Sequence, residues 1–277
     1  MSMAGGYIRA WDRAQNVGCQ ALQIFTKNNM QWNGHVLSQD AAKTFRERTR
    51  ALQYPVCGHA SYLINLAAAR NPTARRSKKA LAEELIRAEA LGLPCLVIHP
   101  GNHMGLGEKE GIRLIAGTIR SVLRRTPAKK VRLALETTAG QGTSIGHRFE
   151  HLAEIYEQVN MPSRLGFCFD TCHVFSAGYD IRRARGLANT FREFDRLLGI
   201  DKILVFHFND SKTGLGSRVD RHEHIGKGHI GIEPFREILN TRAFARLPKI
   251  LETPKGENGR EDINNIKVLR GLVRKGS

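Results

Sequence analysis

Short apolar segments that end in a histidine or an acidic residue recur along this chain and alternate with amphipathic, helix-like stretches. Examples are Leu96-Val97-Ile98-His99 and Leu133-Ala134-Leu135-Glu136. Strands this apolar are typical of a parallel sheet that is buried on both faces. Polar residues at the carboxyl end of strand after strand favour a (β/α)8 TIM barrel, whose active site is built there. A doubly wound sheet would gather them at one switch point.

Periodicity and capping signals place these elements in one continuous pattern. The predicted strands are residues 20–25, 54–59, 95–99, 131–136, 165–170, 203–207 and 249–252. The predicted helices are residues 6–17, 38–52, 71–91, 108–125, 147–160, 188–198, 234–240 and 262–275, with Ser38 as a possible N-cap. No low-complexity linker divides the chain, so we expect a single domain over residues 1–277.

The count of strands is one short of a closed barrel. The residues before Gln20 read as a loop and a helix, with no strand among them. Either the barrel is open, or a first strand is missing because the true start lies upstream of Met1. An exposed strand edge is a liability. We therefore expect lower stability than for a version extended by about ten residues, the length of one strand with its turn.

The ends of the strands carry residues of the types that bind metal ions. Asp220 and His222 lie two positions apart, so in an extended loop both side chains point the same way. Together with the strand ends they make nine candidate ligands: His59, His99, Glu136, Asp170, His173, His207, Asp220, His222 and Glu252. A lone histidine or acid at a strand end is more often a hydrogen-bonded structural residue. Nine of them are too many for one metal ion and suit a cluster of three.

Composition narrows the partners. The net charge of +17 indicates a polyanionic partner such as nucleic acid. The alternative is that the whole proteome has a basic composition and that the charge has no role in binding. No run of 18 apolar residues predicts a membrane span, and the N-terminus lacks a signal-peptide pattern, so we expect a cytoplasmic protein. The five cysteines are odd in number and widely spaced, which does not suggest disulfides or a zinc finger. No phosphate-binding glycine loop is present, so we expect no nucleotide cofactor.

Eight blocks of the sequence, in order, resemble endonuclease IV, the zinc-dependent apurinic/apyrimidinic endonuclease family of base-excision repair. The blocks are Phe25-Thr26-Lys27-Asn28, residues 59–66, His99-Pro100-Gly101, residues 136–142, Asp170-Thr171-Cys172-His173, residues 207–212, residues 217–222 and Glu252-Thr253-Pro254. The resemblance covers nearly the whole chain. Against the family pattern the first barrel strand is missing, which favours the truncated start over an open barrel.

The resemblance implies three zinc ions and assigns their ligands. One ion is expected at His59, His99 and Glu136. The second is expected at Glu136, Asp170, His207 and Glu252, and the third at His173, Asp220 and His222. Glu136 would bridge the first two ions, and Glu136 and Glu252 are the expected catalytic residues. Zinc accepts imidazole and carboxylate ligands, and pairs of metal ions activate water for attack on phosphate esters.

The resemblance also implies the substrate. The expected reaction is hydrolysis of the phosphodiester 5′ to an abasic site in duplex DNA, which leaves a 3′-hydroxyl and a 5′-deoxyribose phosphate. Trimming of blocked 3′ ends is an expected second activity, and we expect a monomer. The residues expected to contact DNA are Lys27, Asn28, Met30, Tyr62, Leu63 and Arg221. Tyr62 and Leu63 could equally pack a loop, and Met30 stands where some relatives have a basic residue.

Two other functions stay open at this point. A sugar isomerase or epimerase on a related barrel also gathers histidines and acids at strand ends, but around one or two divalent ions, and needs no strong positive charge. A non-catalytic DNA-binding barrel would use zinc only for its structure. Asn209 and Asp210, after His207, could orient metal ligands or cap the next turn.

Overall fold

Seven parallel strands form a nearly closed barrel in the computed structural model, which describes residues 3–52, 55–69 and 72–274. In spatial order the strands are β1 (Leu22–Phe25), β2 (Val56–His59), β3 (Cys95–Ile98), β5 (Arg132–Glu136), β7 (Leu165–Asp170), β8 (Ile203–His207) and β11 (Lys249–Ile250). All seven predicted strands are confirmed. The predicted limits at Tyr54, Asn71 and Lys275 lie outside the described residues.

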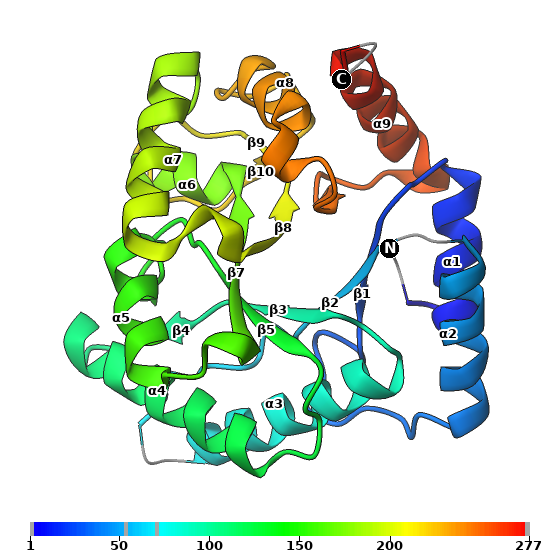
Figure 1. Ribbon diagram of the computed structural model, residues 1–277, viewed down its shortest axis with the longest axis vertical. Coiled ribbons are helices and arrows are strands. Elements are labelled where there is room, and N and C mark those ends of the chain that lie inside the picture. The colour runs from blue at the N-terminus through cyan, green and yellow to red at the C-terminus, as the bar shows by residue number, and fades with distance from the viewer. Residues whose placement is uncertain (1–2, 53–54, 70–71, 275–277) are drawn as a thin grey trace.

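Helices surround the strands, as Figure 1 shows. They are α1 (Tyr7–Asn16), α2 (Gln39–Leu52), α3 (Pro72–Ala90), α4 (Glu108–Arg125), α5 (Phe149–Val159), α6 (Thr171–Ala177), α7 (Ala184–Leu198), α8 (Glu233–Asn240) and α9 (Arg260–Leu272). The eight predicted helices are confirmed, and α6 is additional. The Ser38 hydroxyl accepts a hydrogen bond from the Ala41 amide at 3.2 Å, so Ser38 caps α2 as predicted.

The two faces of the strands bury different side chains because successive residues of a strand point to opposite sides. Leu96, Leu133 and Phe167 face the helices and join the large outer core. The barrel interior is filled by a second, smaller cluster: Cys57, Cys95, Val97, Ala134, Cys168, Val205 and Ile250. The cysteines in this cluster are free thiols, as the sequence predicts for small buried side chains.

Two short antiparallel ribbons lie beyond the carboxyl ends of the strands. The first joins β4 (Gly101–Asn102) to β6 (Ser144–Ile145), and the second joins β9 (Asp210–Ser211) to β10 (His222–Glu223). The second ribbon brings His222 back against the barrel although it lies 15 residues after His207 in sequence. These ribbons therefore fold the strand-exit loops over the carboxyl end of the barrel.

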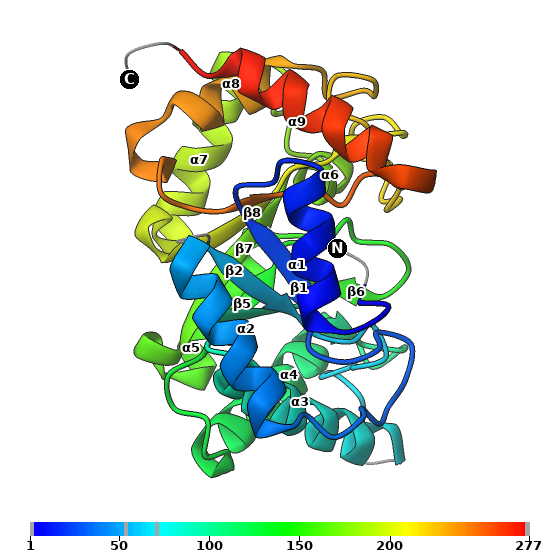
Figure 2. The same cartoon turned by 90° about the vertical axis from the view of Figure 1, so that its right-hand side faces the viewer.

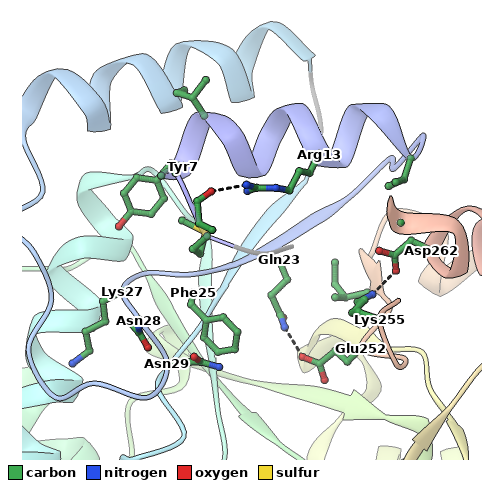
Figure 3. Close-up of a pocket in the computed structure, with 18 of the residues that line it drawn as sticks. Tyr7, Arg13, Gln23, Phe25, Lys27, Asn28, Asn29, Glu252, Lys255 and Asp262 are labelled. Carbon is green, nitrogen blue, oxygen red and sulfur yellow. Dashed lines mark hydrogen bonds and ion pairs between the residues drawn. The ribbon is translucent and has the colours of Figure 1, made fainter. Parts of the chain in front are cut away.

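The barrel has a seam between its two edge strands, β1 and β11, which do not pair with each other within the described part of the chain. Helix α1 lies across β1 beside this seam (Figure 2). A cavity of about 1500 Å³ opens there, lined by residues of α1, of both edge strands and of the segment before α9. In Figure 3 the side chain of Gln23 reaches across the cavity to Glu252, with 2.8 Å between Nε2 and Oε1.

Candidate metal centre

Glu136 lies at the centre of the candidate site. Its carboxylate is fully buried at the end of β5 and faces four imidazoles. The Glu136 oxygens lie 3.3 Å from His59 Nε2, 3.1 Å from His99 Nε2, 3.3 Å from His173 Nδ1 and 2.9 Å from His207 Nδ1. Parallel strands of a barrel end on the same side, which is why residues so distant in sequence meet here.

The other predicted ligands complete the same cluster. Glu252 Oε2 lies 3.1 Å from His207 Nδ1. Asp170 Oδ2 lies 3.8 Å from the same nitrogen and 3.9 Å from His222 Nε2. All nine sequence-predicted side chains are thus brought together at one end of the barrel, although five come from strands, one from α6 and three from loops.

Helix α6 positions His173, and the sequence pattern did not reveal it because the helix is only seven residues long. Asp170 ends β7 and is also the N-cap of α6, since its carboxylate accepts a hydrogen bond from the His173 amide at 2.7 Å. An aspartate such as Asp170, which can accept a hydrogen bond from the amide three residues later, is the N-cap signal that could have predicted this helix. Because α6 begins directly after β7, the side chains of Asp170 and His173 both lie in the site.

Asp220 lies between two imidazoles. The Nε2 atoms of His173 and His222 are each 3.2 Å from a different oxygen of Asp220. Both nitrogens are buried, and neither has a hydrogen-bond partner within the described residues. Buried polar atoms are rarely left unpaired. Two unpaired imidazole nitrogens beside one carboxylate are a donor set that a cation satisfies, and these three residues can hold a metal ion.

The charges in the cluster depend strongly on one another. Burial works against a charged imidazole, yet Asp170 and Asp220 raise the pKa of His173 well above its usual value. Burial likewise opposes ionisation of Glu252, yet the positive charge on His207 lowers the pKa of this carboxyl to about 2. The carboxylates are therefore ionised at neutral pH, while protons on the imidazoles balance their charge. A metal ion has to displace these protons, so its affinity increases as the pH rises.

Two buried thiols lie at the edge of the cluster. Cys168 Sγ is grouped with Glu136 and His207, and Cys172 Sγ with Asp170 and His222. Burial raises the pKa of Cys172 to about 12. The thiolate, not the thiol, binds metal. Nitrogen and oxygen ligands therefore dominate this centre at neutral pH.

Comparisons with known proteins agree with this geometry. The family described as "Xylose isomerase-like TIM barrel" matches residues 11–271. "Probable endonuclease 4" of Chloroflexus aurantiacus is 48% identical over 274 residues, covering 99% of this chain and 96% of the relative. A relative of the same name from Geobacter sulfurreducens is 48% identical over 276 residues, covering 99% of this chain and 93% of the relative.

Among solved structures, endonuclease IV from Thermus thermophilus superposes with a TM-score of 0.86 at 34% identity, covering 98% of this chain and 96% of that chain. The chain belongs to the endonuclease IV family. The predicted family, the TIM-barrel fold and the assignment to the endonucleases, a class of hydrolases, are confirmed.

Polar residues behind the candidate ligands hold them in place by hydrogen bonds. Asn209 donates to Asp170 Oδ2 at 2.7 Å and accepts from the Glu252 amide at 2.8 Å, so it fixes two of them. Asp210 instead accepts from the amides of Gly228 and Ile230, at 3.1 and 2.9 Å, and shapes the following loop. Of the two alternatives predicted for this pair, Asn209 therefore orients candidate ligands and Asp210 stabilises the following turn.

Gln23, which bridges the seam, was not among the residues predicted from the sequence. Its Oε1 lies 2.8 Å from His207 Nε2, and its Nε2 donates to Glu252. An imidazole that binds metal through one nitrogen commonly donates from the other to such an acceptor. Gln23 lies at a buried position of β1 next to Ile24, and a polar residue in so apolar a strand was the available signal.

We expect Gln23→Ala to lower metal affinity or cleavage rate by roughly 10–100-fold, the usual effect of losing a partner of a metal ligand. The reason is that His207 loses its acceptor and Glu252 loses its donor. Titration with zinc against a competing chelator, followed by single-turnover cleavage, would measure both quantities. Gln158→Ala on α5, whose side chain donates to Glu154 one helical turn away, is the matched control. Equal values for Gln23→Ala and the control would contradict the assigned role.

The residues predicted to contact DNA in this endonuclease IV occupy different environments. Asn28, Met30, Tyr62 and Arg221 are exposed, and Leu63 is half-buried. The Tyr62 ring lies 5.3 Å from the ring of His59, directly beside the metal centre. These five side chains lie on the strand-exit loops, and DNA contact by them stays a prediction.

Lys27, the sixth residue predicted to contact DNA, lies in a different environment from the other five. Its side chain is buried, donates to the Trp32 carbonyl and lies 3.8 Å from Glu84 of α3. Glu84 also accepts from the Thr26 hydroxyl and from the Ser61 amide. One buried carboxylate therefore ties the loop after β1 to the loop after β2. In this structure Lys27 supports the two predicted DNA-contacting loops, and its own contact with DNA stays a prediction.

Proposed function

We propose that this protein hydrolyses the phosphodiester 5′ to an abasic site in duplex DNA and leaves a 3′-hydroxyl and a 5′-deoxyribose phosphate. The observation that carries the proposal is the convergence of nine histidine and carboxylate side chains, with Glu136 at their centre, at one end of the barrel in a chain of this family. The net charge of +17 suits a polyanionic substrate. Trimming of blocked 3′ ends is the proposed second activity, since it breaks the same kind of bond.

Three zinc ions are the proposed cofactor. His59, His99 and Glu136 would hold the first, and His173, Asp220 and His222 would hold the third; each trio has its ligand atoms close enough for one ion. The second would be held by Glu136, Asp170, His207 and Glu252, whose contacts converge on His207 Nδ1. When bound, such ions activate water and stabilise the charge that develops on phosphate oxygens.

The side chains around the centre have separate proposed roles. Glu136 and Glu252 are the proposed catalytic residues, because both carboxylates face His207 from the interior of the barrel. No side-chain nucleophile is required. Tyr62 packs edge-on against Phe25 at 5.5 Å between ring centres and lies 5.3 Å from the ring of His59, so its proposed role is to contact DNA beside this ligand. Arg221 is exposed beside Asp220, and its proposed role is to contact a phosphate.

The remaining proposals concern the setting of the reaction. No helix in the described part of the chain has the length and apolar character needed to cross a membrane. We propose a monomer that acts in the cytoplasm on duplex DNA.

The deciding experiment uses an end-labelled duplex with one tetrahydrofuran abasic analogue. We expect a single cut 5′ to the analogue, lost after prolonged chelation and recovered with zinc. A folded, zinc-loaded protein that leaves the duplex intact would refute the proposal. Turnover of free sugars by that same protein would support the isomerase alternative, and tight binding to the duplex without cleavage would support the non-catalytic alternative.

A further inference from the structure

A second group of histidine and carboxylate side chains lies outside the metal centre, where α4 and α5 begin. Glu108 is the first residue of α4, His147 precedes α5, and His151 lies in the first turn of α5. One ligand atom from each of the three residues lies within 4.8 Å of the other two. None of these residues belongs to the nine described above, and the proposed reaction does not use them.

The three side chains converge on one point. His147 Nε2 lies 3.6 Å from Glu108 Oε1, and His151 Nε2 lies 3.2 Å from Glu108 Oε2. The two imidazole rings are 4.7 Å apart and nearly perpendicular, at 88°. Both Nε2 atoms therefore face the same carboxylate from different directions, which is the arrangement of a three-ligand site with room for a further ligand.

Burial leaves one side of the group open. The side chains of His147 and His151 are only 7% and 2% exposed, whereas Glu108 is 41% exposed. His147 Nδ1 lies 3.0 Å from the Ser144 carbonyl, so this nitrogen carries the proton and Nε2 keeps its lone pair. A histidine whose second nitrogen donates to a backbone carbonyl is held in the tautomer that binds metal. The exposed side admits an ion together with water.

Arg148 occupies the open side of the group. Its guanidinium donates to His151 Nε2 at 3.0 Å and to Glu108 Oε2 at 3.2 Å. This side chain is 55% exposed and can turn outward into solvent. The Gly146 amide donates to His151 Nδ1 at 3.4 Å, and this contact has to break if Nε2 is to bind the ion with the ring proton on Nδ1. A positive charge thus already lies where an ion would bind, and Arg148 competes with that ion.

We propose that Glu108, His147 and His151 form a separate binding site for one zinc-type divalent transition-metal ion. The ion joins the first turns of α4 and α5. It also holds the segment that runs from Glu136 to His147, because this segment packs against the imidazole at Gly140, where an added Cβ would lie 3.0 Å from His147 Cβ. The bound ion therefore steadies the loop that follows the central carboxylate of the metal centre.

The test compares the metal content of zinc-loaded proteins after dialysis against buffered free zinc. We expect Glu108→Gln, and His147→Asn combined with His151→Asn, to hold one ion fewer per chain than the parent protein. His35→Asn, at an exposed imidazole, is the matched control and should not change the count. Glu108→Gln keeps the shape of a half-exposed side chain, so it answers the question even if the double variant does not fold.

Arg148→Ala gives the opposite expectation. Removing the competing guanidinium should tighten binding of this ion at least about tenfold in a zinc titration against a competing chelator, in line with the usual 10–100-fold effects around metal ligands. Equal metal content in the parent and both ligand variants would overturn the proposal. Weaker zinc binding by Arg148→Ala would also overturn it, since the group would then be only a hydrogen-bonded network. Cleavage of the abasic duplex by each variant reports separately on the main reaction.

Discussion

Glu136→Gln is expected to lower cleavage of the abasic duplex on the order of 10³-fold, about 4 kcal/mol of transition-state stabilisation at 1.36 kcal/mol per tenfold change. One neutral amide would replace the carboxylate that faces His59, His99, His173 and His207. Zinc content should fall in parallel, because the first and second proposed ions share this ligand. Single-turnover kinetics and metal analysis of the same sample measure the two effects.

Glu157→Gln, at an exposed position of α5, is the matched control for this change and should leave both quantities unaltered. Circular dichroism of the metal-free proteins separates loss of metal from loss of fold. If Glu136→Gln kept its full zinc content and rate, the bridging role of this carboxylate would be wrong, and the centre would have to be built around Asp170 and Glu252 alone.

Lys27→Met is expected to destabilise the fold by about 3–5 kcal/mol, because it leaves the buried Glu84 carboxylate without its counter-charge. Burial raises the pKa of Glu84 above its ordinary value. Between the pKa of Glu84 in the unfolded state and its higher pKa in the folded state, the folded protein binds more protons than the unfolded one, so its stability falls as the pH rises through this range. Without Lys27 the pKa of Glu84 in the folded state should rise further, so the loss of stability should be larger at pH 8 than at pH 5. Denaturant unfolding at the two pH values measures it.

Removing both charges should cost less than removing one. A buried ion pair replaced by apolar side chains of similar volume is often neutral in stability, so Lys27→Met combined with Glu84→Met should recover most of the loss. Lys43→Met, which breaks an exposed pair with Glu47, is the matched control and should have little effect. A loss for Lys27→Met no larger than for Lys43→Met would contradict the buried pair.

Most of the fold was predictable from the sequence because burial on both faces leaves a continuous apolar signal in each strand. Strands β7 and β8 were predicted with their observed limits, 165–170 and 203–207. The short α6 was not, since seven residues give too little periodicity to separate a helix from a loop. The sequence signal for α6 is the capping carboxylate of Asp170, a residue that the sequence analysis had already assigned as a metal ligand.

The candidate ligands were predictable for a different reason. A parallel barrel places every strand end at the same rim, so residues there meet whatever their separation in sequence. The partners of those ligands were not predictable, because they depend on side-chain directions. Lys27 illustrates this: a basic residue in an exit loop suggests DNA contact, yet its side chain turns inward to Glu84. Gln23 carried no motif at all, and only the seam between β1 and β11 explains its position.

That seam has a practical meaning for chemical inhibition. The cavity beside it is lined by Gln23 and Glu252 as well as by Tyr7 and Arg13 of α1 (Figure 3). A small molecule seated there would contact the proposed catalytic carboxylate of Glu252 from the flank of the barrel, and it would also meet Asn28 and Tyr62 of the exit loops. The gap in the barrel wall thus offers small molecules a lateral approach to the candidate metal centre.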